Sequence, residues 1–433
     1  MLALLAALAF SPTADAFCGT YVGGVEDTLT NRVSNVVMVR EGDKTTITMT
    51  GDVSAGVGEF GMLVPVPGDV EDVKVLEDLT LLDRIDRYAG PRLVSYTCED
   101  LHGAVASGFS ANSSSSFGCE GVMEGIQDQL MKEILEQVSG HLGLDLSFGE
   151  GDYDLELLEP ASVAELGVWA TTNGWQLDPG AAAVLERQVR QDTKYLAVTV
   201  DLDDDVPVRR QMLKPIQFSY TSDSFSLPIE LGAAHAEEVQ DVVLHVITDT
   251  WDGQVGVSNY PEFQVEDECL FRDEDESFTD FYSRQIKQGY HAAGGEAAWT
   301  MEYVWAPAKC DPCPDEGPLD EETMRAVGYE GHVGSAVLTR IRARFHPDFV
   351  RGDLVLYGSG LSGQEQLRYV LHDPALESDF PICEEGWSPE PGSCEDEPTD
   401  PVPAGGPALP AGALVVGLVA LVRRRMERAI SHT

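Results

Sequence analysis

The chain has 433 residues, 43% of them hydrophobic, which is enough for one large domain or two medium ones with a packed core. Its 74 acidic residues outnumber the 28 basic ones and give a formal net charge of -46. A surface this negative repels phosphate backbones and anionic lipids, so the composition argues against a nucleic-acid partner. A solvated surface suited to salty surroundings explains the acidity more simply than binding of divalent cations or basic partners.

Residues 1–16 have the pattern of an export signal. An apolar run from Met1 to Phe10 is followed by Ser11-Pro12 and then by Ala14-Asp15-Ala16, the small-x-small form that signal peptidase cleaves. The alternative is a buried N-terminal helix. Because Phe17 is too large to precede a lipidated cysteine, we expect simple cleavage after Ala16 and a mature chain that starts at Phe17-Cys18.

The first part of the body predicts strands and one helix. Residues 36–40 and 44–50 are rich in β-branched side chains and flank Glu41-Gly42-Asp43, which is typical of a β-hairpin. Residues 61–67 have the pattern of a buried strand that proline ends. From Leu79 to Tyr88 apolar residues recur at helical spacing, so we expect a short amphipathic helix that Gly90-Pro91 stops.

The middle of the body predicts alternating short elements. Residues 98–119 are rich in Gly and Ser and indicate a surface loop. Ser162 with Glu165 forms a capping-box pattern, and Asn173-Gly174 is a helix end. We expect helices over 122–138, 162–172 and 179–189, and strands over 153–158 and 195–200.

The second half predicts mostly strands. They cover 216–220, 226–230, 242–248, 299–305, 336–345 and 354–357, with helices over 277–288 and 320–327. Because strands and helices do not alternate regularly, we predict an α+β fold with a mostly antiparallel, twisted sheet, several flanking helices and disulfide staples.

The end of the chain predicts a linker and a membrane-associated tail. Residues 384–407 are acidic and rich in Pro and Gly, as in a disordered stalk. Residues 408–422 are apolar but shorter than the roughly 20 residues of a stable spanning helix, and Arg423, Arg424 and Arg425 follow. With Gly405-Gly406 before it, the tail over 408–433 resembles the Gly-Gly and myxobacterial C-terminal sorting tails. That resemblance implies cutting within the membrane and transfer to the cell surface, whereas a retained single-pass anchor is the alternative.

Eight cysteines in an exported chain suggest disulfides rather than free thiols. The short loops favour pairing of Cys98 with Cys119 and of Cys383 with Cys394. The other candidates are Cys18, Cys269, Cys310 and Cys313, and the sequence does not choose among their pairings.

Several ordered motifs carry a family resemblance over about Phe17 to Asp373. They lie at 17–24, 64–67, 83–94, 151–158, 228–232 and 305–313. Together they resemble the bacterial family known as domain of unknown function 2330. The resemblance implies an exported bacterial protein and supplies no catalytic residues. The predicted domain organisation is therefore a signal peptide over 1–16, a globular domain over 17–383, a linker over 384–407 and a sorting tail over 408–433.

Cys310-Asp311-Pro312-Cys313 is the sharpest candidate for chemistry. A Cys-x-Pro-Cys pair after a strand resembles a thioredoxin active site, where a helix N-terminus lowers the thiol pKa. Here Pro314 and Pro318 follow, so we expect no helix at Cys310, and nearby acidic groups would raise the pKa of a thiol. A structural disulfide is the simpler interpretation.

Metal and hydrolase signatures are incomplete. Residues 201–205 begin like an EF-hand loop, but Val206 and Met212 stand where that loop needs Gly and Glu. Acidic runs at 266–268 and 273–276 flank Cys269 and could hold Ca²⁺, although solvated loop charge explains them too. The nine histidines form no zinc motif, and Ser359 and Ser362 do not form a Gly-x-Ser-x-Gly elbow.

The sequence thus predicts an exported, cell-surface or envelope-anchored protein that binds or scaffolds without catalytic activity and needs no cofactor. Its expected partners are the export and sorting machinery and, through the tail, the membrane. The alternatives are an exported thiol-disulfide protein that uses Cys310 and Cys313, and a calcium-stabilised adhesin.

Overall fold

The computed structural model describes residues 14–15, 18–24, 34–54, 58–94, 151–202, 210–234, 236, 239–265, 277–310, 314 and 317–370. Contacts divide the chain into two units, Met1–Ser393 and Cys394–Thr433, and every described residue belongs to the first. The expected helix over 122–138, the linker and the tail therefore lie outside the described residues. Among the helices that are described, none is long and apolar enough to cross a bilayer.

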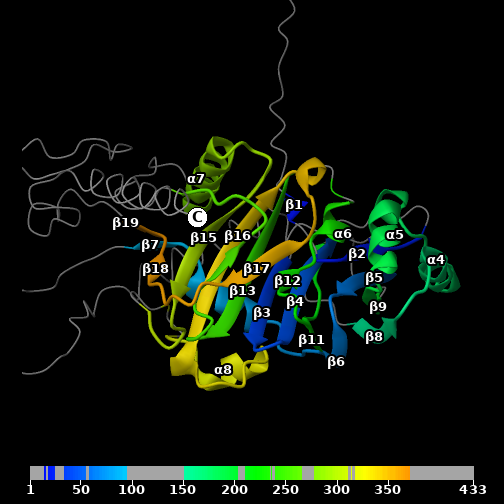
Figure 1. Ribbon diagram of the computed structural model, residues 1–433, viewed down its shortest axis with the longest axis horizontal. Coiled ribbons are helices and arrows are strands. Elements are labelled where there is room, and N and C mark those ends of the chain that lie inside the picture. Colours follow the sequence, from blue (N-terminus) through cyan, green and yellow to red (C-terminus); the bar gives the residue numbers. More distant parts are fainter. Residues whose placement is uncertain are drawn as a thin grey trace, which may run out of the picture. The chain divides into compact units, whose positions relative to one another are not determined.

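The largest sheet has ten strands (Figure 1). They are β1 Ala14–Asp15, β3 Ser34–Glu41, β4 Lys44–Ser54, β6 Asp69–Val75, β10 Arg210–Met212, β11 Ile216–Thr221, β13 Gln240–Asp249, β15 Ala297–Trp305, β16 Ala336–Phe345 and β18 Glu365–Gln366. Their order is β18-β15-β16-β13-β3-β4-β11-β6, with β1 beside β13 and β10 beside β4. Most neighbours are antiparallel, whereas β13 runs parallel to β3 and β1. The α+β prediction with a mostly antiparallel sheet is confirmed.

The predicted hairpin is β3 and β4. The two strands pair from Ser34↔Gly51 to Glu41↔Lys44, which leaves Gly42 and Asp43 as the turn. Gly42 has a φ of 65°, a left-handed conformation that glycine adopts without steric cost. Local sequence alone therefore determines this register.

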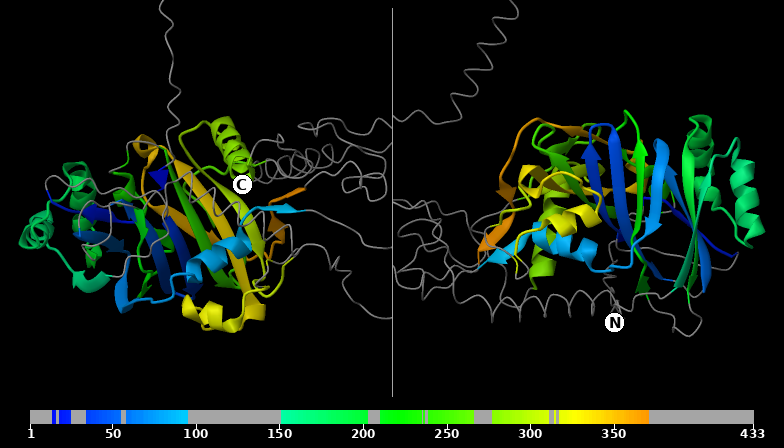
Figure 2. Two further views of the ribbon diagram at one scale, coloured as in Figure 1. Left: turned by 180° about the vertical axis from the view of Figure 1, so that it is seen from behind. Right: turned by 90° about the horizontal axis from the view of Figure 1, so that it is seen from below.

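Helices α1 Leu81–Ala89, α7 Phe278–Ala292 and α8 Glu321–Ala326 pack on one face of the large sheet. The left view in Figure 2, from behind, shows α1 lying across the strands. Leu82 and Ile85 of α1 contact strand residues such as Val37, while Phe281 of α7 packs near Ala298. The predicted amphipathic helix is confirmed, and its apolar stripe points at the sheet.

Two smaller sheets pack against the other face. One consists of β12 Ser226–Leu227, β17 Leu354–Gly358 and β14 Val255–Val257, and the other of β2 Thr20–Val22, β5 Glu59–Val66, β9 Lys194–Leu202 and β8 Gly151–Leu158. Leu354, Leu356 and Val255 from the first and Phe60 and Met62 from the second share a buried core with the large sheet.

The β2-β5-β9-β8 sheet has a second covered face. Helices α4 Val163–Thr172, α5 Ala182–Arg190 and α6 Glu230–Ala233 bury Leu166, Leu185 and Leu231 against Leu63 and Ala197. The remaining elements are the parallel pair β7 Arg92–Val94 and β19 Arg368–Val370 and the 3-10 turns Pro179–Ala181, Val333–Ser335 and Pro347–Phe349. The third predicted helix thus begins as a 3-10 turn at Pro179.

Two local predictions need correction. The strand expected over 226–230 stops at Leu227, because Asp353 accepts hydrogen bonds from the Ile229 and Glu230 amides and the chain turns into α6. The capping box at Ser162 is incomplete: the Ser162 side chain makes no capping bond, and Glu165 instead accepts from the Ala161 amide. β6 was not predicted.

Candidate functional site

Three arginines lie on one face of β16. Strand alternation places Arg340, Arg342 and Arg344 on the face that α1 and α7 cover, while Ile341 and Ala343 enter the opposite core. A guanidinium group stays charged in a protein, so burying three of them requires carboxylates close by.

A β-bulge in β15 supplies one of these carboxylates. The pairing of β15 with β16 shifts between Met301 and Tyr303, which leaves Glu302 as the extra residue. Glu302 is completely buried, and its carboxylate accepts from Arg340 Nη1 and, at 2.5 Å, from Arg342 Nε. The bulge therefore places an acidic side chain among the arginines.

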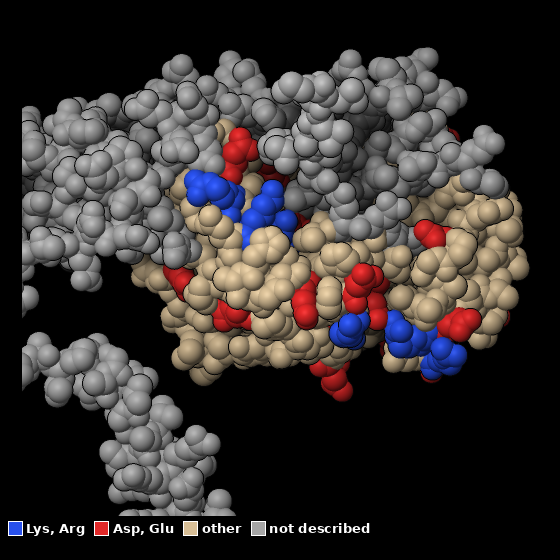
Figure 3. All heavy atoms as spheres, turned by 90° about the horizontal axis from the view of Figure 1, so that it is seen from above, with Lys and Arg blue, Asp and Glu red and all other residues tan. Residues whose placement is uncertain are grey.

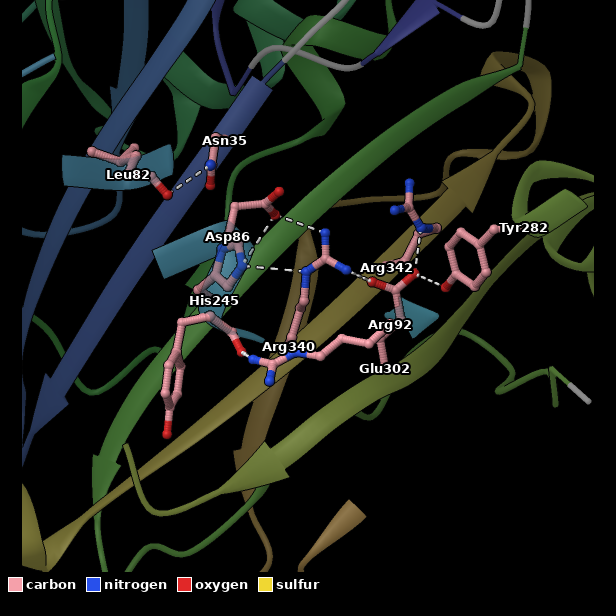
Figure 4. A network of polar contacts seen from close by, with 10 residues as sticks. Asn35, Leu82, Asp86, Arg92, His245, Tyr282, Glu302, Arg340 and Arg342 are labelled. Carbon is pink, nitrogen blue, oxygen red and sulfur yellow. Dashed lines mark hydrogen bonds and ion pairs between the residues drawn. The ribbon is translucent and has the colours of Figure 1, made fainter. Parts of the chain in front are cut away.

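Arg340 uses each of its three nitrogens (Figure 4). Besides Nη1 on Glu302, Nη2 donates to Asp86 Oδ1 of α1 at 2.7 Å, and Nε donates to His245 Nε2 of β13 at 3.3 Å. His245 is directly opposite Arg340 in the β13–β16 register. One side chain thus joins α1, β13, β15 and β16.

The neighbouring arginines extend the network towards α7. Arg342 lies over the ring of Tyr282, whose hydroxyl donates to Glu302 Oε1. Arg344 donates to Asp241 Oδ2 at 2.6 Å and lies over the ring of Tyr290. Three arginines therefore meet three carboxylates, those of Asp86, Glu302 and Asp241.

The arginines favour the ionised form of two of these carboxylates, Glu302 and Asp86. Burial opposes the charge on Glu302, but Arg340 and Arg342 hold its pKa below the ordinary value. Burial likewise opposes the charge on Asp86, and Arg340 and His245 hold the pKa of Asp86 well below its usual range. Burial and the charge of Glu302 raise the pKa of Tyr282 well above its ordinary value. Tyr282 consequently stays protonated and donates.

His245 is neutral at neutral pH. Burial lowers its pKa, although the carboxylate of Asp86 lies 3.4 Å from Nε2. Nε2 also lies 3.3 Å from Nε of Arg340, so the imidazole contacts both members of the Asp86–Arg340 ion pair. Nδ1 is buried without a hydrogen-bond partner among the described residues.

The end of α1 is attached to a second chain segment. The Tyr88 hydroxyl donates to the Lys309 carbonyl and receives a hydrogen bond of 3.2 Å from the Tyr303 hydroxyl. Arg92 donates back to the Tyr88 carbonyl. These bonds hold the chain just before Cys310 against α1.

The chemistry of this network favours a structural role over a catalytic one. The carboxylates already accept from arginines, and a base whose pKa is lowered takes a proton poorly at neutral pH. Access is limited to Asp86, whose side chain is 37% exposed, and Arg342, which is 18% exposed. On the described face drawn in Figure 3, basic side chains also lie beside acidic ones rather than in a field of one sign.

The cysteines that the structure describes differ from each other. Cys310 is disulfide-bonded, and its partner lies outside the described residues. Cys18 was expected in a disulfide, but here it is a free thiol buried in the core between the sheets. Burial and the nearby Asp353 raise the pKa of Cys18 to about 12, and Cys310 packs in a different cluster. The predicted partners Cys98, Cys119, Cys269, Cys313, Cys383 and Cys394 lie outside the described residues.

The other predicted candidates do not converge. The residues that the structure describes contain no group of three or more His, Cys, Asp or Glu able to hold a metal ion, and the acidic runs at 203–205, 266–268 and 273–276 lie outside them. Ser359 and Ser362 lie in a loop after β17, as predicted. Gly405, Gly406, Arg423, Arg424 and Arg425 fall in the undescribed tail.

Sequence reasoning missed the ion-pair network. A signal existed in the run from Arg340 to Phe345, where arginines alternate with apolar residues inside a strand. Such a strand must bury charge on one face if helices cover it. Glu302 gave no such signal, because its position follows from the bulge.

Comparison with known proteins identifies a family. Residues 12–357 match the profile of a family described as uncharacterized protein conserved in bacteria (DUF2330). No curated protein matches the chain. Among solved structures, the crystal structure of baculovirus P35 aligns with 77% of this chain and 98% of its own, at 7% identity and a TM-score of 0.30. A likeness at that level carries no functional argument.

Proposed function

The chain belongs to the DUF2330 family of uncharacterised bacterial proteins, and we propose that it is an exported protein of the cell envelope that works as a binding or structural module without catalytic activity. The observation that carries the proposal is the ion-pair network around Arg340. Its charged groups bind one another and fasten α1 and α7 to the large sheet. A scaffold of this kind suits a protein that binds partners through its surface.

Export is supported by the two ends of the chain and by its cysteines. The leader over 1–16 and the tail over 408–433 carry the sorting patterns, and disulfides persist mainly outside the cytoplasm. The disulfide at Cys310 fits this environment. In this proposal the partners are the export and sorting machinery and, until the tail is processed, the membrane.

Mass spectrometry of the protein isolated from its native host tests the proposal. We expect a mature N-terminus at Phe17, the protein in envelope or surface fractions, and disulfides that include Cys310. The same peptides tell whether the chain is cut near Gly405-Gly406 or retains its tail. Recovery from the cytoplasm with residues 1–16 intact and eight free thiols would overturn it.

A second function rests on the disulfide of Cys310. An exported thiol-disulfide protein would cycle this bond with Cys313 as the other thiol, and Cys310 follows β15 closely. The next helix, α8, begins only at Glu321, so no described helix N-terminus lies at Cys310 to activate its thiol. Thiol titration after mild reduction decides: an acidic, reactive thiol at Cys310 favours the redox function, and an unreactive one removes it.

A further inference from the structure

Exposed apolar side chains lie on the β12-β17-β14 sheet and in two loops next to it. Six large hydrophobic residues are exposed among the described residues, and four of them are Trp251, Val355, Tyr357 and Leu361. Trp251 is 87% exposed, which is rare for tryptophan. We call these four residues the Trp251 strip.

Two residues of the strip lie on the outer face of β17. Val355 and Tyr357 project from the face of β17 opposite to the buried Leu354 and Leu356. The loop that carries Leu361 is bonded to the β13–β14 turn that carries Trp251: the Gln254 amide donates to the Leu361 carbonyl at 2.7 Å. The described chain thus holds the two ends of the strip together.

The strip is also built rigidly. Gly256 of β14 is paired with Tyr357, and a Cβ on it would lie 2.8 Å from the tyrosine hydroxyl oxygen, so the ring covers this glycine. A Cβ at Gly253 would lie 2.3 Å from the Leu361 carbonyl oxygen. Both glycines therefore permit a close approach, of the Tyr357 ring to β14 and of the Leu361 backbone to the turn that carries Trp251.

The surroundings of Trp251 are acidic. Asp249 accepts hydrogen bonds from the Trp251 and Asp252 amides, which places two carboxylates at the turn. Burial and the charge of Asp249 raise the pKa of Asp252. The nearby Arg40 is buried, and its guanidinium group already donates hydrogen bonds to Thr45 and to the Ser222 carbonyl.

We propose that the Trp251 strip docks an extended, basic segment of another polypeptide, with a Lys or Arg side chain over the Trp251 ring. Apolar side chains of the segment cover Val355, Tyr357 and Leu361, while its cation meets Asp249 and Asp252. An aromatic face attracts a cation, and adjacent carboxylates add to the attraction. The inference rests on the proposed binding role and specifies its partner.

Charge complementarity selects this occupant. The chain carries a formal net charge of -46, so a second copy of it or an acidic partner meets repulsion at this turn. A neutral glycan would stack on the aromatic rings and donate hydroxyl hydrogen bonds to Asp249 and Asp252, but it carries no positive charge to pair with these carboxylates.

The test measures binding of a labelled peptide of alternating Lys and Val to the full chain by fluorescence anisotropy. We expect Trp251→Ala and Leu361→Ser each to weaken binding about tenfold, as at interface hot spots. Asp252→Asn should weaken it less and flatten its salt dependence. Val168→Ser is the matched control, because Val168 is 63% exposed on α4 outside the strip, and it should leave the affinity unchanged.

Several results would overturn the inference. Equal affinity of Trp251→Ala and Val168→Ser would mean that the peptide binds elsewhere, and equal binding of a Glu-Val peptide would remove the charge argument. Binding of a neutral oligosaccharide without peptide binding, or a dimer in sedimentation that Trp251→Ala dissolves, would assign the strip to another occupant. Cell fractionation tests the proposed location independently of peptide binding. If the protein is in the envelope but does not bind the peptide, this inference is refuted and the proposed location stands.

Discussion

Arg340 is the side chain whose loss should harm the fold most. Arg340→Met would leave the buried carboxylate of Glu302 with Arg342 and Tyr282 alone, and Asp86 without its guanidinium partner. Breaking a buried pair from one side costs about 3–5 kcal/mol. We expect urea denaturation to show a loss of this size. Arg325→Met is the control, since its ion pair with Glu321 is exposed and worth about 0–1 kcal/mol; equal losses would contradict the buried role.

Asp86 should make stability depend on pH. Its folded pKa lies below the ordinary value of about 3.9, so its contribution is present above that value and is lost as the pH falls through the folded pKa. Asp86→Asn should therefore lower the urea midpoint at pH 7, and the deficit should shrink only below about pH 4. Asp83→Asn, in an exposed pair with Arg87, should show little deficit at any pH. A deficit that already vanishes by pH 6 would contradict the lowered pKa of Asp86.

At the scale of elements, the sequence predicted those that local patterns determine, but it did not predict the irregular ones. The hairpin at Gly42 and the helix from Leu81 to Ala89 follow from turn chemistry and apolar spacing, which act over a few residues. The bulge at Glu302 depends on the register with β16, and the early end of β12 depends on Asp353, more than a hundred residues along the chain. Contacts at such separations leave no local pattern.

The packing of α4 on β5 provides a matched pair of glycine substitutions. A Cβ at Gly61 would lie 2.6 Å from a ring carbon of Trp175 and 2.9 Å from one of Trp169, so Gly61→Ala should cost about 1–3 kcal/mol by overpacking. Gly167, inside α4, has nothing within 4 Å of its Cβ position. Gly167→Ala should stabilise by about 0.5–1 kcal/mol. Chemical denaturation measures both, and a loss in each would contradict this account of β5.

At the scale of the whole molecule, the large sheet joins distant parts of the chain. β13 pairs in parallel with β3 and antiparallel with β16, so residues near 36, 245 and 340 meet in one layer. Composition predicted a packed core, and the order of the predicted strands and helices predicted the class of fold. No alternation pattern reveals that β3 and β13 are neighbours. The ion-pair network is a consequence of this order, because Asp86, His245, Glu302 and Arg340 come together only when those strands do.

The net charge predicts how the whole molecule responds to salt. A chain at -46 repels itself, and added salt screens the repulsion, so the melting temperature should rise as NaCl increases from low concentration to about 0.5 M. CaCl₂ and MgCl₂ at matched ionic strength separate screening from binding. If the acidic residues only form a solvated surface, Ca²⁺ and Mg²⁺ should raise the melting temperature equally, and a chelator should leave it unchanged. A steep rise with Ca²⁺ alone, reversed by chelator, would instead support a calcium-stabilised protein, with sites to be sought in the acidic runs at 203–205, 266–268 and 273–276.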